Sequence, residues 1–281
     1  MLGFNHFGKL GQLGNQMFQY AALRGIANKI GTNFMIPDHR EIFDDGIGNK
    51  YTILLFDVFN LKNASYKGML NTVHYVQESH FHFDDEMFDL PKKEDYSLYG
   101  FFQTEKYFKH IEDSIRIDFS FKDEIKNYWE PLRKQFENPI SLHIRRGDFI
   151  TNSGNHPPLE LDYYEEALKE FDSNRDVVIF SDDTDWCKKQ KLFEGDRFAV
   201  AEGGNQFYDM CLMTMCDDFI IANSTFSWWG AWLGNRGKVV APKKWFGKNL
   251  NHDTKDLYCE NWIKLWEYQL RFQLVNQREG V

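Results

Sequence analysis

Short apolar runs and helical patterns alternate along the second half of the chain. The apolar runs predict buried strands at 140–144, 176–180, 197–201, 218–222 and 238–241. Apolar residues recurring at helical spacing predict helices at 161–171, 186–193, 206–216 and 226–233. Strands that are apolar throughout and alternate with helices form parallel sheets covered on both faces. We therefore predict a Rossmann-like domain over residues 139–255.

The first half of the chain is less regular. Residues 1–30 have the pattern of a short strand, a glycine loop and a helix, and residues 31–37 follow as a second strand. Residues 41–99 show no clear period. We predict a separate domain over 1–138, and a C-terminal helix within 256–281.

Aromatic and acidic residues are frequent between residues 75 and 99. Aromatic faces stack on the C–H surfaces of sugars, so this stretch could form a sugar platform. The alternative is ordinary packing and solvated loop. Such a stretch is more often packing and solvated loop, and we favour that interpretation.

Composition limits the class of protein. The chain has 281 residues, enough for two domains, and a formal net charge of −9. An acidic chain argues against a nucleic-acid partner, which would need a basic face. Its four cysteines have no metal-site spacing and are expected to be free thiols. Without a leader pattern or a long apolar run, a cytoplasmic location is expected, with peripheral membrane association left open and the oligomeric state undetermined.

Residues 140–149, Ile-Ser-Leu-His-Ile-Arg-Arg-Gly-Asp-Phe, carry the clearest chemical signal. His143, Arg145, Arg146 and Asp148 are polar residues at the end of an apolar strand. The planar guanidinium of arginine pairs with two phosphate oxygens at once, so a diphosphate ligand is the natural partner. The alternative is a surface strand end with an internal Arg–Asp ion pair.

Polar residues also follow two other predicted strands. They are Ser181, Asp182, Asp183, Thr184 and Asp185 after one strand, and Asn223, Ser224, Thr225, Phe226 and Ser227 after the other. The carboxyl ends of parallel strands lie on one edge of a sheet, so all three segments are expected to line one crevice. The second set also opens a helix. Its hydroxyls can therefore be helix N-caps, phosphate ligands or both.

The acidic residues 182, 183 and 185 could hold Mg²⁺ on a nucleotide, or accept hydrogen bonds from a base or ribose. Two adjacent arginines already offset the charge of a diphosphate, so we favour the interpretation without a metal or other cofactor.

The glycine loop at residues 8–16 feeds the first predicted helix. Such a loop can present backbone N–H groups to an anion, or it can be a turn that needs glycine. Its spacing is neither that of a dinucleotide fold nor that of a Walker loop.

Several of these segments together resemble the α-1,2-fucosyltransferases of glycosyltransferase family 11. The matching segments are residues 11–21, 143–149 and 221–233, supported by 101–108 and 161–164. The arginine motif is also shared with α-1,6- and protein O-fucosyltransferases. Gln12 and Phe149 depart from the usual residues of the family, and neither departure changes a charged group.

The resemblance implies an α/β fold of the GT-B type, with two Rossmann-like domains whose parallel sheets face each other across a cleft. It implies inverting, metal-independent transfer of fucose from GDP-fucose to the 2-hydroxyl of a β-galactoside. Arg145 would clamp the β-phosphate, supported by Arg146 and His143, and Asp182 or Asp183 would meet the guanosine. Asn223, Ser224, Thr225, Phe226 and Ser227 would line the diphosphate, and Gly11, Gly14, Asn15 and Gln16 would close the site.

The base that accepts the proton of the acceptor hydroxyl is not identified by the sequence. Asp148, which we also place among the catalytic residues, His156 and Glu160 are candidates, and the diphosphate or water are alternatives. Two other functions stay open, namely a fucosyltransferase of another linkage and a nucleotide-sugar-binding protein without turnover.

Overall fold

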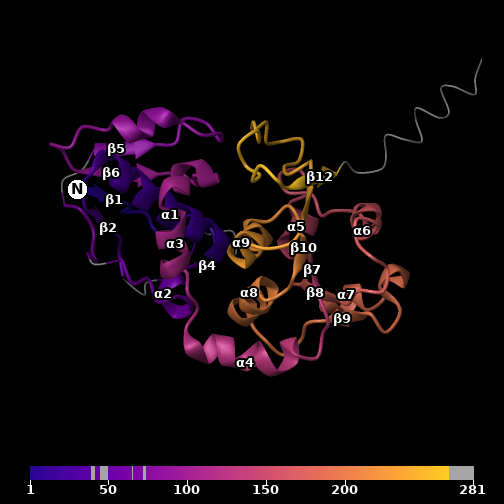
Figure 1. Ribbon diagram of the computed structural model, residues 1–281. Coiled ribbons are helices and arrows are strands. Elements are labelled where there is room, and N and C mark those ends of the chain that lie inside the picture. The colour runs from indigo at the N-terminus through magenta and orange to yellow at the C-terminus, as the bar shows by residue number, and fades with distance from the viewer. Residues whose placement is uncertain (39–41, 45–49, 65, 72–73, 266–281) are drawn as a thin grey trace, which may run out of the picture. The chain divides into compact units, whose positions relative to one another are not determined.

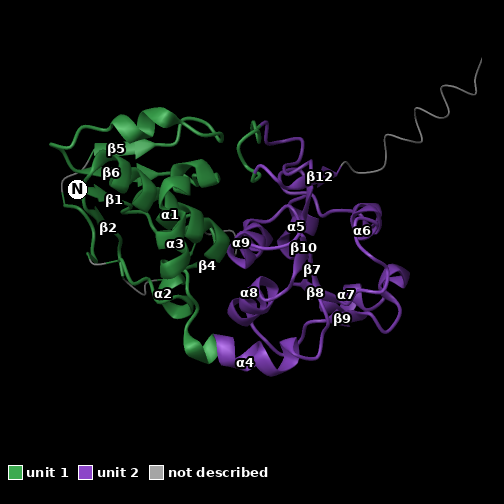
Figure 2. Ribbon diagram, viewed as in Figure 1, with its two compact units in different colours: residues 1–125, 252–259 green, residues 126–251, 260–281 purple. Residues whose placement is uncertain are grey.

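The computed structural model describes residues 1–38, 42–44, 50–64, 66–71 and 74–265. The chain forms two compact units (Figures 1 and 2). Unit 1 comprises residues 1–125 and 252–259, and unit 2 comprises 126–251 with the segment that begins at Glu260. The chain passes from the first unit to the second within helix α4 (Asp123–Arg133), before the domain boundary predicted at 138.

Unit 1 is built on a parallel sheet with the strand order β2-β1-β6-β5. Its strands are β1 (Leu2–Gly3), β2 (Phe34–Met35), β5 (His74–Gln77) and β6 (Tyr96–Tyr99). Helix α1 (Leu13–Ile30) is buried over most of its surface, because the sheet and several short helical turns surround it. The short helices are α2 (Leu55–Val58), η1 (Asp85–Asp89), η2 (Glu105–Tyr107), η3 (Lys109–Ile111) and α3 (Glu112–Asp118). A separate antiparallel pair joins β3 (Phe43–Asp44) to β4 (Lys50–Tyr51).

Unit 2 contains a parallel sheet with the strand order β12-β11-β10-β7-β8-β9. The strands are β7 (Ile140–Ile144), β8 (Val177–Ser181), β9 (Phe198–Val200), β10 (Asp218–Ile220), β11 (Val239–Pro242) and β12 (Ile263–Leu265). The helices are α5 (Gly147–Thr151), α6 (Leu161–Leu168), α7 (Thr184–Cys187), η4 (Lys191–Phe193), α8 (Gln206–Thr214) and α9 (Thr225–Gly234).

The strand order places a topological switch point beside β7. From β7 the chain moves outward to β8 and β9, and then returns to build β10, β11 and β12 on the other side. The carboxyl ends of β7 and β10 therefore flank the crevice where doubly wound sheets bind ligands.

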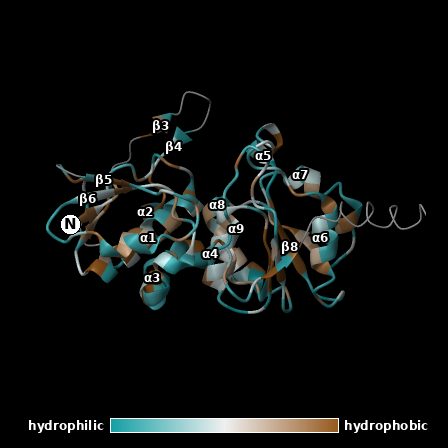
Figure 3. Ribbon diagram, turned by 90° about the horizontal axis from the view of Figure 1, so that it is seen from above, coloured by the Kyte–Doolittle hydropathy of each residue, from teal (hydrophilic) through white to brown (hydrophobic). Residues whose placement is uncertain are grey.

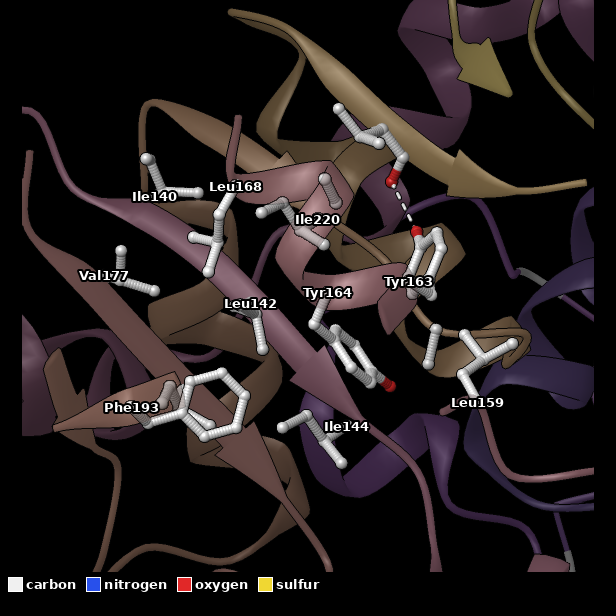
Figure 4. Close-up of a cluster of buried hydrophobic side chains, with 14 of the residues drawn as sticks. Ile140, Leu142, Ile144, Leu159, Tyr163, Tyr164, Leu168, Val177, Phe193 and Ile220 are labelled. Carbon is white, nitrogen blue, oxygen red and sulfur yellow. Dashed lines mark hydrogen bonds between the residues drawn. The ribbon is translucent and has the colours of Figure 1, made fainter. Parts of the chain in front are cut away.

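Alternation along β7 explains which side chains reach each face of this sheet. Ile140, Leu142 and Ile144 belong to a hydrophobic cluster with α6, where Tyr163 and Tyr164 are fully buried (Figure 4). His143 points to the other face and lies beside Phe226 of α9. Hydrophobic residues gather on the strands between the helices, as Figure 3 shows.

The structure confirms the predicted α/β class with parallel sheets, and also the alternation of strands and helices in the second half. Two local predictions were wrong. The segment after β7, expected as a loop, begins the short helix α5, and Ile263–Leu265, expected as part of a helix, form strand β12. Pairing with β11 overrides the helical spacing of this segment. The remainder of the predicted C-terminal helix, 266–281, lies outside the described residues.

The predicted free thiols are confirmed for Cys187, Cys211, Cys216 and Cys259.

Candidate active site

The polar segments predicted to converge follow neighbouring strands. In the sheet register Ile144 pairs with Ser181, and Leu142 pairs with Ile220. Because β8, β7 and β10 are parallel, Arg145, Asp182 and Asn223 leave the same edge of unit 2. The convergence expected from the sequence is therefore present on this unit.

Arg145 bridges two carboxylates at this edge. Its Nη2 lies 2.6 Å from Asp148 Oδ1, and its Nη1 lies 3.0 Å from Asp182 Oδ2. The Phe149 ring lies below the guanidinium, with 5.4 Å between the guanidinium carbon and the ring centroid. The Arg145 side chain is about one-third exposed, so these ion pairs are weak and can exchange for phosphate oxygens at little cost.

Arg146 is held by a different set of groups. Its backbone N–H donates to Asp182 Oδ1 at 2.9 Å, and its Nε donates to Asp183 Oδ2 at 3.0 Å. The guanidinium carbon lies 3.9 Å from the centroid of a Trp186 ring, within cation–π range. Asp183 also caps α7, accepting from the Trp186 N–H.

Gly147 is required by the close approach of Asp182. A Cβ at this position would lie 2.5 Å from Asp182 Oδ2, a distance that Cβ atoms do not tolerate. The glycine thus lets one carboxylate contact both arginines of the motif.

His143 is buried beneath the arginines and is neutral. Burial first, and then the positive charge of Arg145, lower its pKa to about 3. Its ring centroid lies 5.5 Å from that of Phe226, and its Nδ1 has no hydrogen-bond partner within the described part of the chain. His143 therefore adds an uncharged polar ring beneath the arginine pair.

The segment after β10 begins α9. Ser224 is the N-cap, and its Oγ accepts from the Phe226 N–H at 3.3 Å. Thr225 and Phe226 are partly exposed in the first helical turn, which contains no acidic residue. The positive end of the helix dipole therefore lies at the same sheet edge as the arginines, which suits an anion.

Two predicted site residues of this segment use their polar groups within the protein. Asn223 donates through Nδ2 to the carbonyl oxygens of Pro157 and Trp245, at 2.9 and 3.1 Å. Ser227 is fully buried, and its Oγ donates to the carbonyl oxygens of Ala222 and Ser224. Their contact with a ligand stays a prediction.

The glycine loop lies at the carboxyl end of β1 and belongs to unit 1. Gly11 has φ +83°, as a turn requires. Gln16 is buried and binds the backbone on both sides, donating to Gly11 and Thr52 and accepting from the Leu54 N–H. Gly14 is buried at the start of α1 and Asn15 accepts from Gln103 at 3.0 Å, so the loop is firmly held.

The three candidate bases lie in distinct surroundings. Asp148 is more than half exposed and paired with Arg145, while Glu160 is exposed just before α6. The His156 ring stacks on Phe149 with centroids 5.2 Å apart and lies 5.6 Å from Phe246. Among the three, His156 and Asp148 join the group around Arg145.

Sequence reasoning missed the aromatic support of this edge. Phe149 lies beneath Arg145 and Trp186 beneath Arg146. Phe149 directly follows the arginine motif, and Trp186 directly follows the aspartates after β8. This short spacing could have indicated that the two rings contact the arginines. The hydroxyl of Tyr163 donates to the carbonyl oxygens of Ile221, directly after β10, and of Val240, within β11, and so holds these two segments to α6.

Within the described ranges no group of three or more His, Cys, Asp or Glu side chains is arranged to hold a metal ion. Likewise, no helix in the described part of the chain is long and apolar enough to cross a membrane.

Comparison with known sequences identifies the family. The profile of Glycosyl transferase family 11 matches residues 3–266. The chain belongs to this family. Among curated relatives, it is 30% identical to the O-antigen biosynthesis glycosyltransferase WbnK of Escherichia coli, over 91% of this chain and 98% of the relative. It is 31% identical to an α-1,2-colitosyltransferase of the same species, over 91% and 96%. It is 26% identical to the galactoside α-(1,2)-fucosyltransferase 2 of Bos taurus, over 80% and 67%.

Solved structures place this family 11 enzyme in the GT-B fold class. The crystal structure of POFUT1 in complex with GDP superposes with a TM-score of 0.55 at 10% identity, covering 95% of this chain and 98% of that one. The α-1,6-fucosyltransferase NodZ, soaked with GDP-fucose, gives a TM-score of 0.51 at 11% identity, covering 85% and 93%. The GT-B fold predicted from the sequence is thereby confirmed.

Proposed function

We propose that this enzyme transfers L-fucose from GDP-fucose to the 2-hydroxyl of a terminal β-galactoside, with inversion at the anomeric carbon and without a metal ion. One observation carries the proposal. Arg145 and Arg146 leave the end of β7 at the switch point, beside the positive end of α9. This arrangement fits a departing nucleoside diphosphate.

The chemistry follows from charge development. As the bond between fucose and the β-phosphate breaks, negative charge accumulates on the diphosphate and positive charge on the sugar ring. A guanidinium already oriented by Asp148 and Asp182 stabilises that negative charge without reorganisation at the moment of reaction. Only an interaction that strengthens in the transition state accelerates the step, and the growing charge supplies that difference.

The relatives support the choice of donor and linkage. One is named for α-1,2-colitosyl transfer and another for galactoside α-(1,2)-fucosyl transfer. Two structural neighbours carry GDP or were soaked with GDP-fucose. We infer a GDP-activated deoxy sugar as donor and an α-1,2 linkage in the product.

The test is a donor and acceptor screen with purified protein, followed by linkage analysis of the product. We expect GDP release and an α-1,2-fucosylated galactoside, in the presence or absence of EDTA. Arg145→Ala should fold normally and transfer at least about 10²-fold more slowly, as is typical when a donor to a developing anion is removed. Arg116→Ala is a matched control, since it removes a partly exposed arginine paired with Glu112 in α3.

Near-normal turnover of Arg145→Ala would contradict the proposed binding of the β-phosphate by Arg145. A product with another linkage would show that a different hydroxyl of the acceptor receives the sugar. If GDP is released no faster than by the spontaneous hydrolysis of GDP-fucose, the protein binds nucleotide sugars without turning them over. Loss of activity in EDTA would contradict the metal-free mechanism.

A second donor deserves the same screen, because the relative at 31% identity is named for colitose. Colitose is fucose without its 3-hydroxyl. Comparing kcat/KM for GDP-fucose and GDP-colitose decides between them. A site that hydrogen-bonds the 3-hydroxyl will strongly prefer GDP-fucose, because its polar group would be left unpaired by colitose.

A further inference from the structure

Helix α6 carries two adjacent, fully buried tyrosines whose hydroxyl groups differ in one respect. The Tyr163 hydroxyl donates to two backbone carbonyl oxygens, those of Ile221 and Val240. The Tyr164 hydroxyl has no hydrogen-bond partner among the residues that the structure describes. Both side chains are 0% exposed, and their rings pack edge-on with centroids 5.1 Å apart. Buried polar groups without a partner are rare, so the second hydroxyl needs a physical explanation.

The unpaired hydroxyl costs stability. The Tyr164 ring belongs to the hydrophobic cluster that also contains Ile144, Ile179 and Cys187. Tyr164→Phe would leave the same ring in this cluster, and folding would no longer strip a hydroxyl of its hydration. Folding by itself therefore gains nothing from this oxygen atom.

The Tyr164 hydroxyl lies near the charged groups of the arginine motif. Its ring lies beside Ile144, the last residue of β7 (Figure 4). Arg146 follows Ile144 by two residues, and Asp182 directly follows the residue that pairs with Ile144 in the sheet. Burial and then the Cys187 thiol raise the pKa of Tyr164, while the charge of Arg146 lowers this pKa and that of Asp182 raises it. The hydroxyl is therefore a proton donor at neutral pH, within electrostatic range of one arginine and one carboxylate of the site.

Asp182 is the group at this edge that needs a further donor when a diphosphate binds. Its Oδ1 accepts from the Arg146 N–H at 2.9 Å, and its Oδ2 lies 3.0 Å from Arg145 Nη1. Phosphate oxygens that bind Arg145 compete with Oδ2 for the guanidinium and weaken this ion pair. Because the Asp182 side chain is only 26% exposed, water replaces the lost partner incompletely.

We propose that Tyr164 is a positioning residue for nucleotide binding. Its hydroxyl donates to the Asp182 carboxylate when phosphate oxygens draw the Arg145 guanidinium away, and so keeps Asp182 on the Arg146 N–H. This exchange takes place on binding, before the transfer step. A hydrogen bond that forms only in the complex strengthens nucleotide binding and adds nothing to the stability of the protein alone. The inference rests on the proposed function for the diphosphate ligand.

The experiment compares two neighbouring tyrosines that differ in hydrogen bonding. Tyr164→Phe removes the unpaired hydroxyl, and Tyr163→Phe, the matched control, removes the paired hydroxyl from the same helix. For the purified wild type and each variant, calorimetric titration gives Kd for GDP, and thermal denaturation gives the Tm with and without GDP. Steady-state kinetics add KM for GDP-fucose.

We expect Tyr164→Phe to raise Kd for GDP about tenfold, with the Tm without GDP unchanged or higher. A tenfold change corresponds to about 1.4 kcal/mol, near the lower end for a hydrogen bond to a charged group. KM for GDP-fucose should rise by a similar factor. Tyr163→Phe should do the opposite, lowering the Tm without GDP while Kd for GDP stays as in the wild type.

A double-mutant cycle identifies the partner of the hydroxyl. If Tyr164 donates to Asp182, Tyr164→Phe should have no further effect on Kd for GDP in the Asp182→Ala background, because the acceptor is already absent. The same tenfold loss in both backgrounds would rule out Asp182 as the partner and overturn the inference.

Two other results would overturn the inference while leaving the proposed function intact. One is a wild-type Kd for GDP in Tyr164→Phe. The other is a lower Tm of Tyr164→Phe without GDP, which would show that the hydroxyl already has a partner, such as a buried water, before the nucleotide binds. Failure of the wild-type protein to bind GDP would instead contradict the proposed function itself, and the inference with it.

Discussion

Asp182 contacts both arginines of the motif, each through a different carboxylate oxygen. Its Oδ2 lies 3.0 Å from Arg145 Nη1, and its Oδ1 accepts from the Arg146 backbone N–H at 2.9 Å. The side chain thus fixes the direction of one guanidinium and the path of the backbone that follows β7. If Arg145 binds the diphosphate as proposed, we expect that binding to depend on this carboxylate, whether or not Asp182 itself contacts the ligand.

Asp182→Asn should lower kcat/KM for GDP-fucose by about tenfold, since a hydrogen bond to a charged group contributes about 1.5–3 kcal/mol and the amide retains part of it. Steady-state kinetics at varied GDP-fucose concentration measure the effect. Asp196→Asn, at an exposed aspartate in the turn before β9, is the control and should behave as wild type. Equal activity of the two variants would show that Asp182 does not orient Arg145.

Gly147→Ala should also disturb the contact between Asp182 and Arg145. The added Cβ would meet Asp182 Oδ2 at 2.5 Å and displace it, so activity should fall by about tenfold or more. The melting temperature should change little, because Gly147 is exposed. The double variant Gly147→Ala/Asp182→Asn should be no slower than the worse single variant, since both disturb one interaction. Additive losses would indicate independent effects.

Tyr163→Phe should destabilise unit 2 by about 1–3 kcal/mol, because two buried carbonyl oxygens lose their shared donor. The lost bonds run to Ile221 at 2.7 Å and to Val240 at 3.3 Å. Urea unfolding measures the change. Tyr128→Phe, which removes a half-exposed hydroxyl bonded to the Gly203 carbonyl oxygen, should cost less. A larger loss for Tyr128→Phe would contradict this assignment.

The stability of the protein should depend on pH through Glu78. Burial raises the pKa of Glu78 to about 7, although the N–H groups of Phe101 and Phe102 act in the opposite direction. A carboxyl with a raised folded-state pKa binds more protons in the folded than in the unfolded state. Its stabilising contribution is therefore complete below about pH 4.5 and is lost as pH rises through about 7.

Glu78→Gln removes this titration. Relative to wild type, the melting temperature of Glu78→Gln should rise between pH 5 and pH 8, measured by thermal denaturation at several pH values. Glu94→Gln is the control, being an exposed glutamate in the same unit. A difference between wild type and Glu78→Gln that stays constant with pH would disprove the raised pKa.

Much of the fold was predictable from local pattern. The strands and helices of unit 2 follow from apolar runs alternating with helical spacing, and burial on both faces of a parallel sheet requires that pattern. Helix α5 and strand β12 were not predictable. Helix α5 is a single short helix directly after the arginines. Strand β12 is stabilised by pairing with β11, and local sequence propensity does not predict such pairing.

The sequence by itself determined the chemical groups of the site and their place at strand ends. Arg145, Asp182 and Ser224 follow apolar strands, and parallel strands bring their ends to one edge. Tertiary structure alone decided which atoms pair. Asp182 contacts both arginines only because Gly147 leaves room for it, and Trp186 and Phe149 support the guanidinium groups only because the turns after β7 and β8 bring them together. Periodicity along a chain specifies which face a residue occupies, whereas side-chain partners depend on the packing of segments distant in sequence.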